Sequence, residues 1–277
     1  MKIRTAYMPL NTYPDAVSDD AVRAAVGFAA SLGAALHVTT FAINIPQMRS
    51  PLGGLVLDVP GMVRVAEERS RAECLRLGGV VREAGSAIDF DLDQCEVVLG
   101  AALDAAADEA RYYDLSVLPW SGDSIAAQDM TQAVVFGSGR PTIVVPPSAR
   151  VETLHHLAVA WDGSRVAARA LWDAVALLPE GGRIAVLTVQ DEKLLVGQGI
   201  AQSMALSLGK RGFAAEAHEI AIGSRTIGET LQEAALEAGA SLLAMGGFGH
   251  SRIRDFILGG ATKGVFSDLR LPVLMSH

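Results

Sequence analysis

Hydrophobic and polar positions along the chain fall into two alternating patterns, short apolar runs and longer stretches with helical spacing. The runs at 3–10 (IRTAYMPL) and 35–43 are typical of buried strands, and the stretch between them, 18–33, has apolar residues at helical spacing. Ser18 is a suitable amino-terminal cap for this helix, and Gly33 is a suitable end. The order strand, helix, strand predicts parallel strands joined by a right-handed crossover.

The same alternation continues to the end of the chain and predicts five strands in each half. In the first half the further elements are expected as helix 61–84, strand 88–98, helix 101–113, strand 115–121, helix 124–137 and strand 141–147. In the second half we expect strands within 154–164, 183–190, 214–222, 241–247 and 271–276, and helices at 164–178, 198–211, 226–238 and 259–268. The repeated order indicates an internal duplication, and its clearest local match is VVFGSGRPTIVV (134–145) with GVFSDLRLPVLM (264–275).

The two repeats meet at PPSARVETLHH, where Pro146 and Pro147 end the last strand of the first half. We therefore expect two tandem domains of the α/β class, residues 1–147 and residues 152–277. A length of 277 residues fits two such domains better than one large core.

Composition narrows the class of protein. Half of the residues are apolar, 19% are charged and only 5% are aromatic, which suits small-residue helices packed on parallel strands. The net charge of −8, without a dominant Lys/Arg cluster, excludes a nonspecific nucleic-acid partner. No apolar run approaches transmembrane length, and the first residues do not form a signal peptide, so no membrane partner is expected. Cys74 and Cys95 lack ligand spacing and favour a reduced, cytoplasmic setting.

The histidines and serines of the chain do not stand in patterns that predict a metal site or a catalytic site. His155 and His156 are adjacent in a strand and face opposite sides, so one metal ion does not easily use both. His37 and His218 lack a second ligand at metal spacing. No serine stands in a G-x-S-x-G elbow. We therefore predict neither a metal site nor a catalytic residue.

Two loops of the second half follow parallel strands and are the site candidates. Ligands of open parallel sheets bind beyond the carboxyl ends of the strands, where the strand order reverses. The first loop is Asp162-Gly163-Ser164, where Ser164 is suited to cap the next helix. Taken alone, this loop is more simply an ordinary capped turn.

The second loop is MGGFGHSRIRDFILGGATKGVF, which runs from Met245 to Phe266. Its glycines let backbone N–H groups approach an anion closely, and the amino-terminus of a helix adds about half a unit of positive charge. Basic and hydroxyl side chains lie in or beside it: His250, Ser251, Arg252, Arg254 and Lys263. The loop is a phosphate cradle in outline.

On these residues both halves resemble the universal stress protein (UspA-like) domain, and the chain is similar to the tandem members of that family. The ATP-binding members share a G-x2-G-x9-G-(S/T) motif, which matches Gly246, Gly249 and Gly259, and the aspartate that ends their first strand matches Asp162. The resemblance implies two Rossmann-like (adenine-nucleotide alpha hydrolase-like) domains, each a five-stranded parallel sheet with helices on both faces. It implies ATP or AMP as ligand, with Mg²⁺ accompanying ATP.

The resemblance also assigns roles to positions. Asp162 and Val189 would hold the adenosine part, and the glycine loop would hold the phosphates. The full set of nucleotide-binding residues expected is Asp162, Gly163, Val189, Gly246, Gly249, His250, Arg252, Gly259, Gly260 and Ala261.

One departure from the motif concerns Gly260, which replaces the Ser/Thr. The loss of one hydrogen bond to a charged group costs about 1.5–3 kcal/mol, or about one to two decades of affinity, unless Thr262, Ser251 or a basic side chain substitutes. Binding is therefore expected to be weaker or altered.

The first half departs much further. Pro9 to Asn11 stand in place of the Asp-Gly-Ser turn, and Pro119 and Trp120 stand where the second half has Gly246 and Gly247. Proline removes a donor and tryptophan fills space, so this loop is not expected to cradle phosphate in the manner of the family. The first half is expected to be structural or to take an altered ligand.

Three functions follow as hypotheses. The leading one is a stress-response protein that binds an adenine nucleotide and acts through binding or signalling rather than turnover. The alternatives are slow Mg²⁺-dependent ATP hydrolysis, with Arg252 or Lys263 stabilising the transferred charge, and a ligand-free interaction module. In the family, short last strands such as PTIVVPP and LPVLMS mediate dimer contacts. We therefore hypothesise that the two halves pair through them as an internal pseudo-dimer, beyond which a homodimer can form.

Overall fold

The computed structural model describes residues 4–46, 58–122, 124–190, 199–247, 265–266 and 268–277. The strands are β1 (Arg4–Asn11), β2 (Ala34–Asn44), β3 (Phe90–Val98), β4 (Leu115–Pro119), β5 (Thr142–Val145), β6 (His156–Ala160), β7 (Arg183–Gln190), β8 (Ala214–Ala221), β9 (Leu242–Gly246) and β10 (Val273–Ser276). The helices are α1 (Asp19–Ser31), α2 (Val59–Ala84), α3 (Ala102–Ala110), α4 (Ile125–Gly137), α5 (Arg165–Val175), α6 (Ile200–Gly209) and α7 (Ile227–Glu237).

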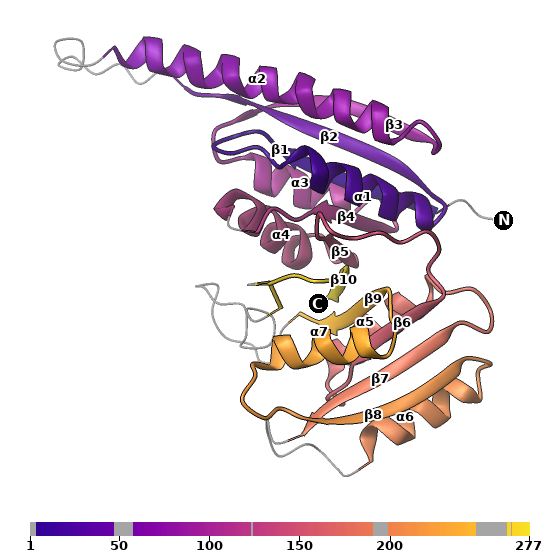
Figure 1. The fold of residues 1–277 in the computed structure, drawn as a ribbon. Helices are drawn as coiled ribbons and strands as arrows, with labels where there is room; N and C mark the ends of the chain where they lie inside the picture. Colours follow the sequence, from indigo (N-terminus) through magenta and orange to yellow (C-terminus); the bar gives the residue numbers. More distant parts are fainter. Residues whose placement is uncertain (1–3, 47–57, 123, 191–198, 248–264, 267) are drawn as a thin grey trace.

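The ten strands among the described residues lie in one continuous sheet, in the order β3-β2-β1-β4-β5-β10-β9-β6-β7-β8 (Figure 1). Neighbouring strands are parallel except at the centre, where β5 and β10 pair antiparallel with Val144 opposite Val273. The expected α/β class with a mostly parallel sheet is therefore confirmed. The last strands of the two halves do pair with each other, as the pseudo-dimer hypothesis requires.

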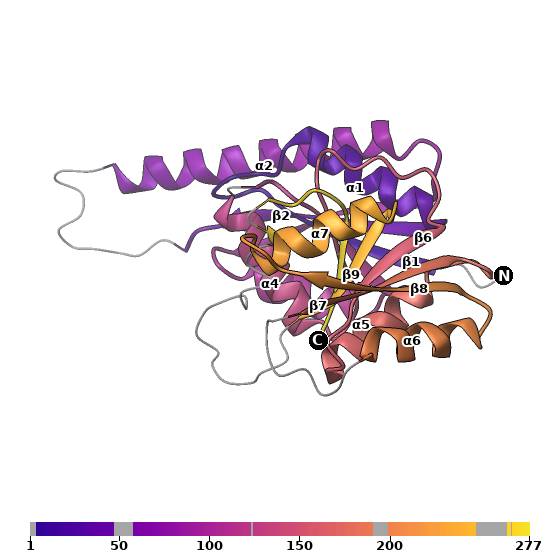
Figure 2. The ribbon, with the colours of Figure 1, turned by 60° about the horizontal axis from the view of Figure 1, so that its bottom comes forward.

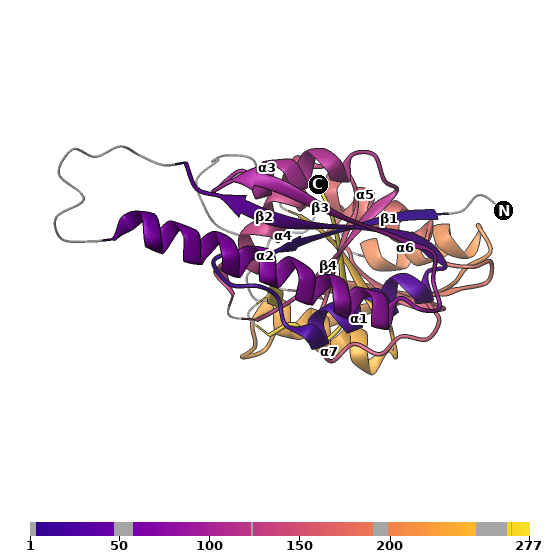
Figure 3. The same ribbon diagram turned by 90° about the horizontal axis from the view of Figure 1, so that it is seen from above.

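The core does not stop at the junction between the halves. One face of the sheet is covered by α1, α2, α5 and α6, and a single hydrophobic cluster beneath them includes Ile143 and Val145 of β5 together with Leu157 and Leu274 of the second half. The other face carries α3, α4 and α7 over two further clusters. Figures 2 and 3 show that the amino-terminal end of α2 projects beyond the other described helices and strands.

Matching hydrogen bonds relate the two halves position by position. The Trp120 N–H donates to the Val145 carbonyl at 2.9 Å, and the Gly247 N–H donates to the Ser276 carbonyl at 2.8 Å. Each bond joins the residue after a fourth strand to the end of a fifth strand. Trp120 therefore occupies the place of Gly247, in agreement with the sequence comparison.

Local signals set the element ends as expected. Ser18 and Ser164 are the amino-terminal caps of α1 and α5, and their hydroxyls accept from the backbone N–H groups three residues on. Of the helix expected at 259–268, the described residues 265–266 are helical. Among the described helices, none is both long and apolar enough to cross a membrane.

Candidate functional site

The strand order of the second half reverses between β6 and β9, so their carboxyl ends are the predicted ligand edge. Beyond β6 the chain stays attached to β7: the Trp161 N–H donates to the Leu187 carbonyl, and the Thr188 hydroxyl donates to the Trp161 carbonyl, each at 2.7 Å. These two bonds fix the direction in which the chain leaves the sheet just before Asp162.

Asp162, Gly163 and Ser164 form a tight turn into α5. The Ser164 N–H donates to Asp162 Oδ1 at 2.8 Å, and the Ser164 hydroxyl accepts from the Ala167 N–H at 3.2 Å. Gly163 has φ +76°, which favours glycine. The turn therefore has the structural role that its sequence allows, and it presents the Asp162 carboxylate, which is exposed, at the ligand edge.

Val189 lies near the end of β7, beyond the last pair of the ladder with β6, which joins Ala160 to Leu187. Past β6 the chain stays on β7 through the bonds of Trp161 to Leu187 and Thr188, which immediately precede Asp162 and Val189. The Val189 side chain is 7% exposed and packs in the cluster with residues of α7 and β9. A ligand at this edge would therefore meet the backbone at the end of β7 rather than the Val189 side chain.

Gly246 ends β9 and lies directly against the start of α5. A Cβ atom at this position would stand 2.7 Å from the Val166 backbone carbon and 2.8 Å from the Ala167 nitrogen, which is closer than real Cβ atoms come. Only glycine lets β9 and the first turn of α5 approach this closely. Gly246 thus has a packing role at the site, besides any contact with a ligand.

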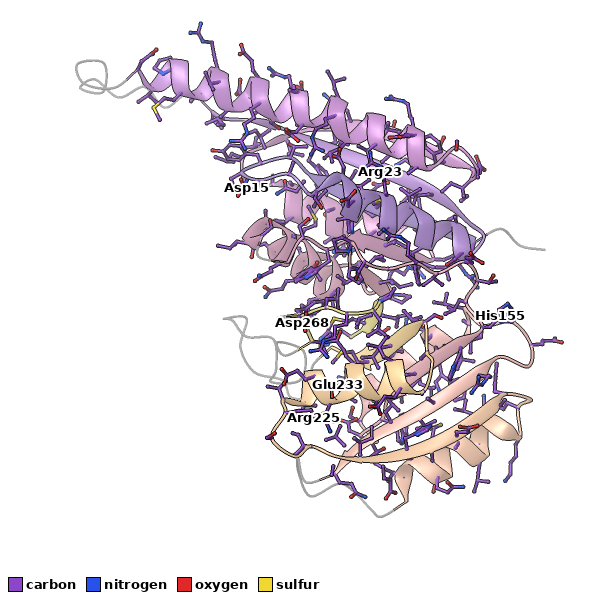
Figure 4. The ribbon with its side chains drawn as sticks, in the orientation of Figure 1. Asp15, Arg23, His155, Arg225, Glu233 and Asp268 are labelled. Atoms are coloured by element: carbon purple, nitrogen blue, oxygen red, sulfur yellow. The ribbon has the colours of Figure 1, made fainter. Side chains whose placement is uncertain are left out.

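The segment after the glycine-rich loop is held by a buried side chain of α7. Gln232 is 0% exposed, and its amide nitrogen donates to the Asp268 carbonyl at 2.9 Å while its oxygen accepts from the Arg270 N–H at 2.8 Å. Arg270 also pairs with Glu233, which pairs with Arg225 in turn. Figure 4 labels Glu233 on α7, Arg225 just before the start of that helix, and Asp268.

The structure brings together four of the expected ligand residues, Asp162, Gly163, Val189 and Gly246, at the carboxyl edge of β6, β7 and β9. The other six lie outside the described residues: Gly249, His250, Arg252, Gly259, Gly260 and Ala261.

At the corresponding edge of the first half, side chains of the same half form hydrogen bonds with the backbone groups at the end of β2. The Thr12 hydroxyl donates to the Phe41 carbonyl at 2.5 Å and lies 2.7 Å from the Ser70 hydroxyl, which accepts from the Ile43 N–H at 3.0 Å. Glu67 accepts from the Ile45 N–H at 2.8 Å. Side chains of α2 thus occupy the end of β2, where the second half has the end of β7.

A polar cluster that the sequence did not predict lies at the opposite, amino end of the second-half strands. His156, Arg183, Glu216 and His218 line a cavity of about 30 Å³, enough for one water molecule. Burial lowers the pKa of His156, and the nearby Arg183 guanidinium lowers it further. The two histidines come from different strands, so sequence spacing gives no sign of their proximity. Across the described residues, no three His, Cys, Asp or Glu side chains gather as metal ligands.

Known proteins share both the sequence pattern and the fold. Residues 153–277 match the sequence model of the universal stress protein family. The chain is similar in structure to a universal stress protein from Archaeoglobus fulgidus DSM 4304, with a TM-score of 0.67 and 18% identity over 98% of this chain and 95% of that one. It is also similar to a functionally unknown protein from Pseudomonas aeruginosa PAO1, with a TM-score of 0.52 and 14% identity over 98% and 92%. No curated protein sequence matches the chain.

Proposed function

Because residues 153–277 belong to the universal stress protein family, we propose that the second half binds an adenine nucleotide, ATP or AMP, and serves a stress response through binding rather than turnover. The observation that carries the proposal is the convergence of Asp162, the end of β7 and Gly246 at the point where the strand order reverses. The glycine motif continues from Gly246 into the loop that would hold the phosphates.

Each described group has a role that its chemistry allows. Asp162 Oδ1 already accepts from the Ser164 N–H, and the second oxygen of this acceptor-only carboxylate is suited to the hydroxyl groups of a ribose. The backbone at Val189 would lie against the adenine. The loop glycines would offer N–H groups to the phosphates, as the family resemblance implies.

Mg²⁺ enters the proposal only with ATP. Asp162 contributes one carboxylate, and the described residues hold no cluster of three ligands around it. An Mg²⁺ ion that accompanied ATP would be bound chiefly by phosphate oxygens, as is usual for this ion at nucleotide sites.

The proposal also covers the division into domains, the role of the first half and the location of the protein. We place the division of the chain at residues 1–147 and 152–277, with the first half structural and the protein cytoplasmic. The polar stretch between β5 and β6 supports the division, and the free thiols of Cys74 and Cys95 support the location. The side-chain bonds at the end of β2 support the structural role of the first half. A homodimer of the full chain is a further assembly to be tested by its mass in solution.

Isothermal titration calorimetry with ATP, AMP and adenosine tests the proposed ligand. Asp162→Ala removes an acceptor for the ribose, and we expect all three ligands to bind about tenfold more weakly, in line with one hydrogen bond to a charged group. Asp15→Ala is the matched control, because Asp15 lies in the corresponding loop of the first half (Figure 4). The proposal fails if the unmodified protein shows neither heat of binding nor a shift in melting temperature with millimolar ATP or AMP.

A further inference from the structure

The helix α2 carries a regular seam of residues along its outer side. From the cap residue onward these residues follow one another in alternating steps of three and four, as in a coiled coil: Asp58, Gly61, Val65, Glu68, Ala72, Leu75, Gly79 and Arg82. All are exposed except Gly61, which is half-buried, and the exposed fractions of Val65 and Leu75 are 65% and 73%. Figure 1 shows α2 along the outer edge of the described structure, so this seam has no partner among the described residues.

The α2 seam is not the side by which the helix packs on its own half. The buried residues of α2 that lie opposite the seam at helical spacing include Ser70, Cys74, Leu77 and Val81. One side of α2 is therefore already packed on the sheet and on α1. A helix that is packed on one side and has apolar residues at coiled-coil spacing on the other is suited to a second partner.

Gly79 indicates that this partner approaches closely. It lies inside α2, where glycine is less favourable than alanine, and nothing lies within 4 Å of the place where its Cβ would stand. The neighbouring Gly78 differs, because its Cβ would stand 3.1 Å from the Leu92 side chain. Packing within the chain thus accounts for Gly78 but not for Gly79. A second helix against the seam accounts for Gly79, because the missing side chain lets the two backbones come close.

The spacing of the seam is the same when it is read from either end, and its centre is at Ser70. Two copies of α2 that lie antiparallel about a two-fold axis near Ser70 therefore place every seam residue opposite another one. Leu75 of one copy meets Val65 of the second copy, and Gly79 meets Gly61. The seam is thus complementary to itself in size.

Its charges are complementary in the same arrangement. Arg82 of one copy lies opposite Asp58 of the second copy at both ends of the pair, and Glu68 faces the part of the second helix that carries Arg69 and Arg71. Within the described part of the chain, Glu68 and Arg82 form no ion pair, and those of Arg69 and Arg71 are long, at 4.0 and 3.9 Å. A parallel pair would instead bring Glu68 against Glu68 and Arg82 against Arg82, which is unfavourable.

We propose that the α2 seam joins two copies of the chain as an antiparallel helix pair. Between residues 58 and 82 the contact extends over about 36 Å, at a helical rise of about 1.5 Å per residue. This surface differs from the pairing of β5 with β10, which already takes place within one chain. It is also separate from the proposed nucleotide site, so a failure of this inference leaves nucleotide binding by the second half unaffected.

Sedimentation equilibrium of the full chain tests the dimer. A single pair of helices is at the small end of specific interfaces, so we expect the mass to rise from one chain to two as the protein concentration approaches about 100 µM. Leu75→Glu places a carboxylate against Val65 of the second copy, and we expect it to weaken the dimer more than about tenfold. Because Leu75 is exposed, the variant should keep the circular dichroism spectrum of the unmodified protein.

Leu206→Glu is the matched control. Leu206 is also exposed, at 59%, but it lies on α6, at the other end of the sheet from α2. The same substitution there should leave the dimer unchanged. If Leu75→Glu does not fold, Val65→Glu replaces it with the same expectation, because the two residues meet in the proposed pair.

Cross-linking tests the antiparallel direction. Proteins with Val65→Cys or Leu75→Cys, each with Cys95→Ser, are treated separately and as a mixture with a short bismaleimide reagent; the remaining Cys74 is buried. The mixture should give most of the cross-linked dimer, because residue 65 of one copy lies opposite residue 75 of the second copy. Two cysteines at position 65 would be about 15 Å apart along the helix axis, so this protein alone should cross-link poorly.

Three results would overturn the proposal. The first is an unmodified protein that keeps the mass of one chain up to about 100 µM, well within the range in which weak specific interfaces form. The second is a folded Leu75→Glu variant that dimerises as strongly as Leu206→Glu, because the dimer would then use another surface. The third is a Val65→Cys protein that cross-links with itself as efficiently as the mixture does, because the helices would then not be antiparallel.

Discussion

Gly246 and Gly247 are neighbours in sequence, yet the structure predicts that replacement by alanine lowers the stability of the protein at Gly246 and leaves it nearly unchanged at Gly247. At Gly246 the new Cβ would stand 2.7 Å from both the backbone carbon and Cγ2 of Val166, about 0.7 Å closer than the 3.4 Å at which ordinary contacts begin. Two of the three nearest atoms are backbone, so rotation of a side chain cannot relieve the overlap. At Gly247 the nearest atom is the flexible end of Met275, at 3.4 Å.

Moving the first turn of α5 away from β9 loosens a packed helix and strains the turn at Asp162. Overpacking of this kind costs about 1–3 kcal/mol. For a chain of this length, each kcal/mol lowers the melting temperature by about 2–4 °C, so Gly246→Ala should melt several degrees lower. Gly247→Ala meets only ordinary contacts, and the reduced entropy of its unfolded chain offsets any small loss, so it should melt within about 2 °C of the unmodified protein.

Thermal unfolding followed by circular dichroism, with urea unfolding as a second measure, compares the two variants directly. The reasoning about α5 is refuted if Gly246→Ala is as stable as the unmodified protein, or if both alanine variants lose the same stability. The result also bears on ligand binding. Because Gly246→Val would displace α5, a loss of nucleotide binding in that variant does not by itself identify Gly246 as a phosphate ligand.

Three further predictions concern stability. The pKa of His156 is lowered in the folded state, so at acidic pH the unfolded chain takes up a proton that the folded chain does not. The free energy of unfolding should therefore fall as the pH drops below about 6.5. In urea titrations at a series of pH values, His156→Asn should reduce this dependence. Arg4 donates to the carbonyls of Leu32 and Ala176, the residues that follow α1 in the first half and α5 in the second. Arg4→Met should cost about 1 kcal/mol by urea unfolding, and an unchanged midpoint would contradict a stabilising role for this link. Thr226 and Glu229 form a capping box at α7, and Thr226→Ala should cost about 1 kcal/mol, with Thr226→Ser retaining most of it.

Patterns that are local in sequence predicted most of the fold. Helical spacing and cap residues such as Ser18 and Ser164 act within one turn, so they are readable without knowledge of the partners. The short apolar last strands required a partner, and in the structure each is the other's partner. At the site, Asp162 and its turn were predicted because a strand end, a glycine and a cap follow one another directly.

Features that depend on residues far apart in sequence could not be predicted. Thr12 and Ser70 meet because α2 crosses the end of β2, and no spacing rule connects them. His156 and His218 come together only when β6, β7 and β8 are in register. The close approach of Gly246 to Val166 is likewise a property of packing. The glycine motif alone explains Gly246 only by ligand binding.

The shared core determines how a ligand of one half affects the whole chain. Beneath α1 and α5 the hydrophobic cluster runs without interruption from β1 to β7, so separating the halves would expose residues such as Val145, Leu157 and Leu274. The halves are therefore expected to unfold in one transition rather than two. A nucleotide bound only by the second half then stabilises the entire molecule, by about 2.7 kcal/mol at a concentration one hundred times its Kd. A first half without a nucleotide site of its own would still contribute to that response, because the core that it shares with the second half belongs to the same cooperative unit.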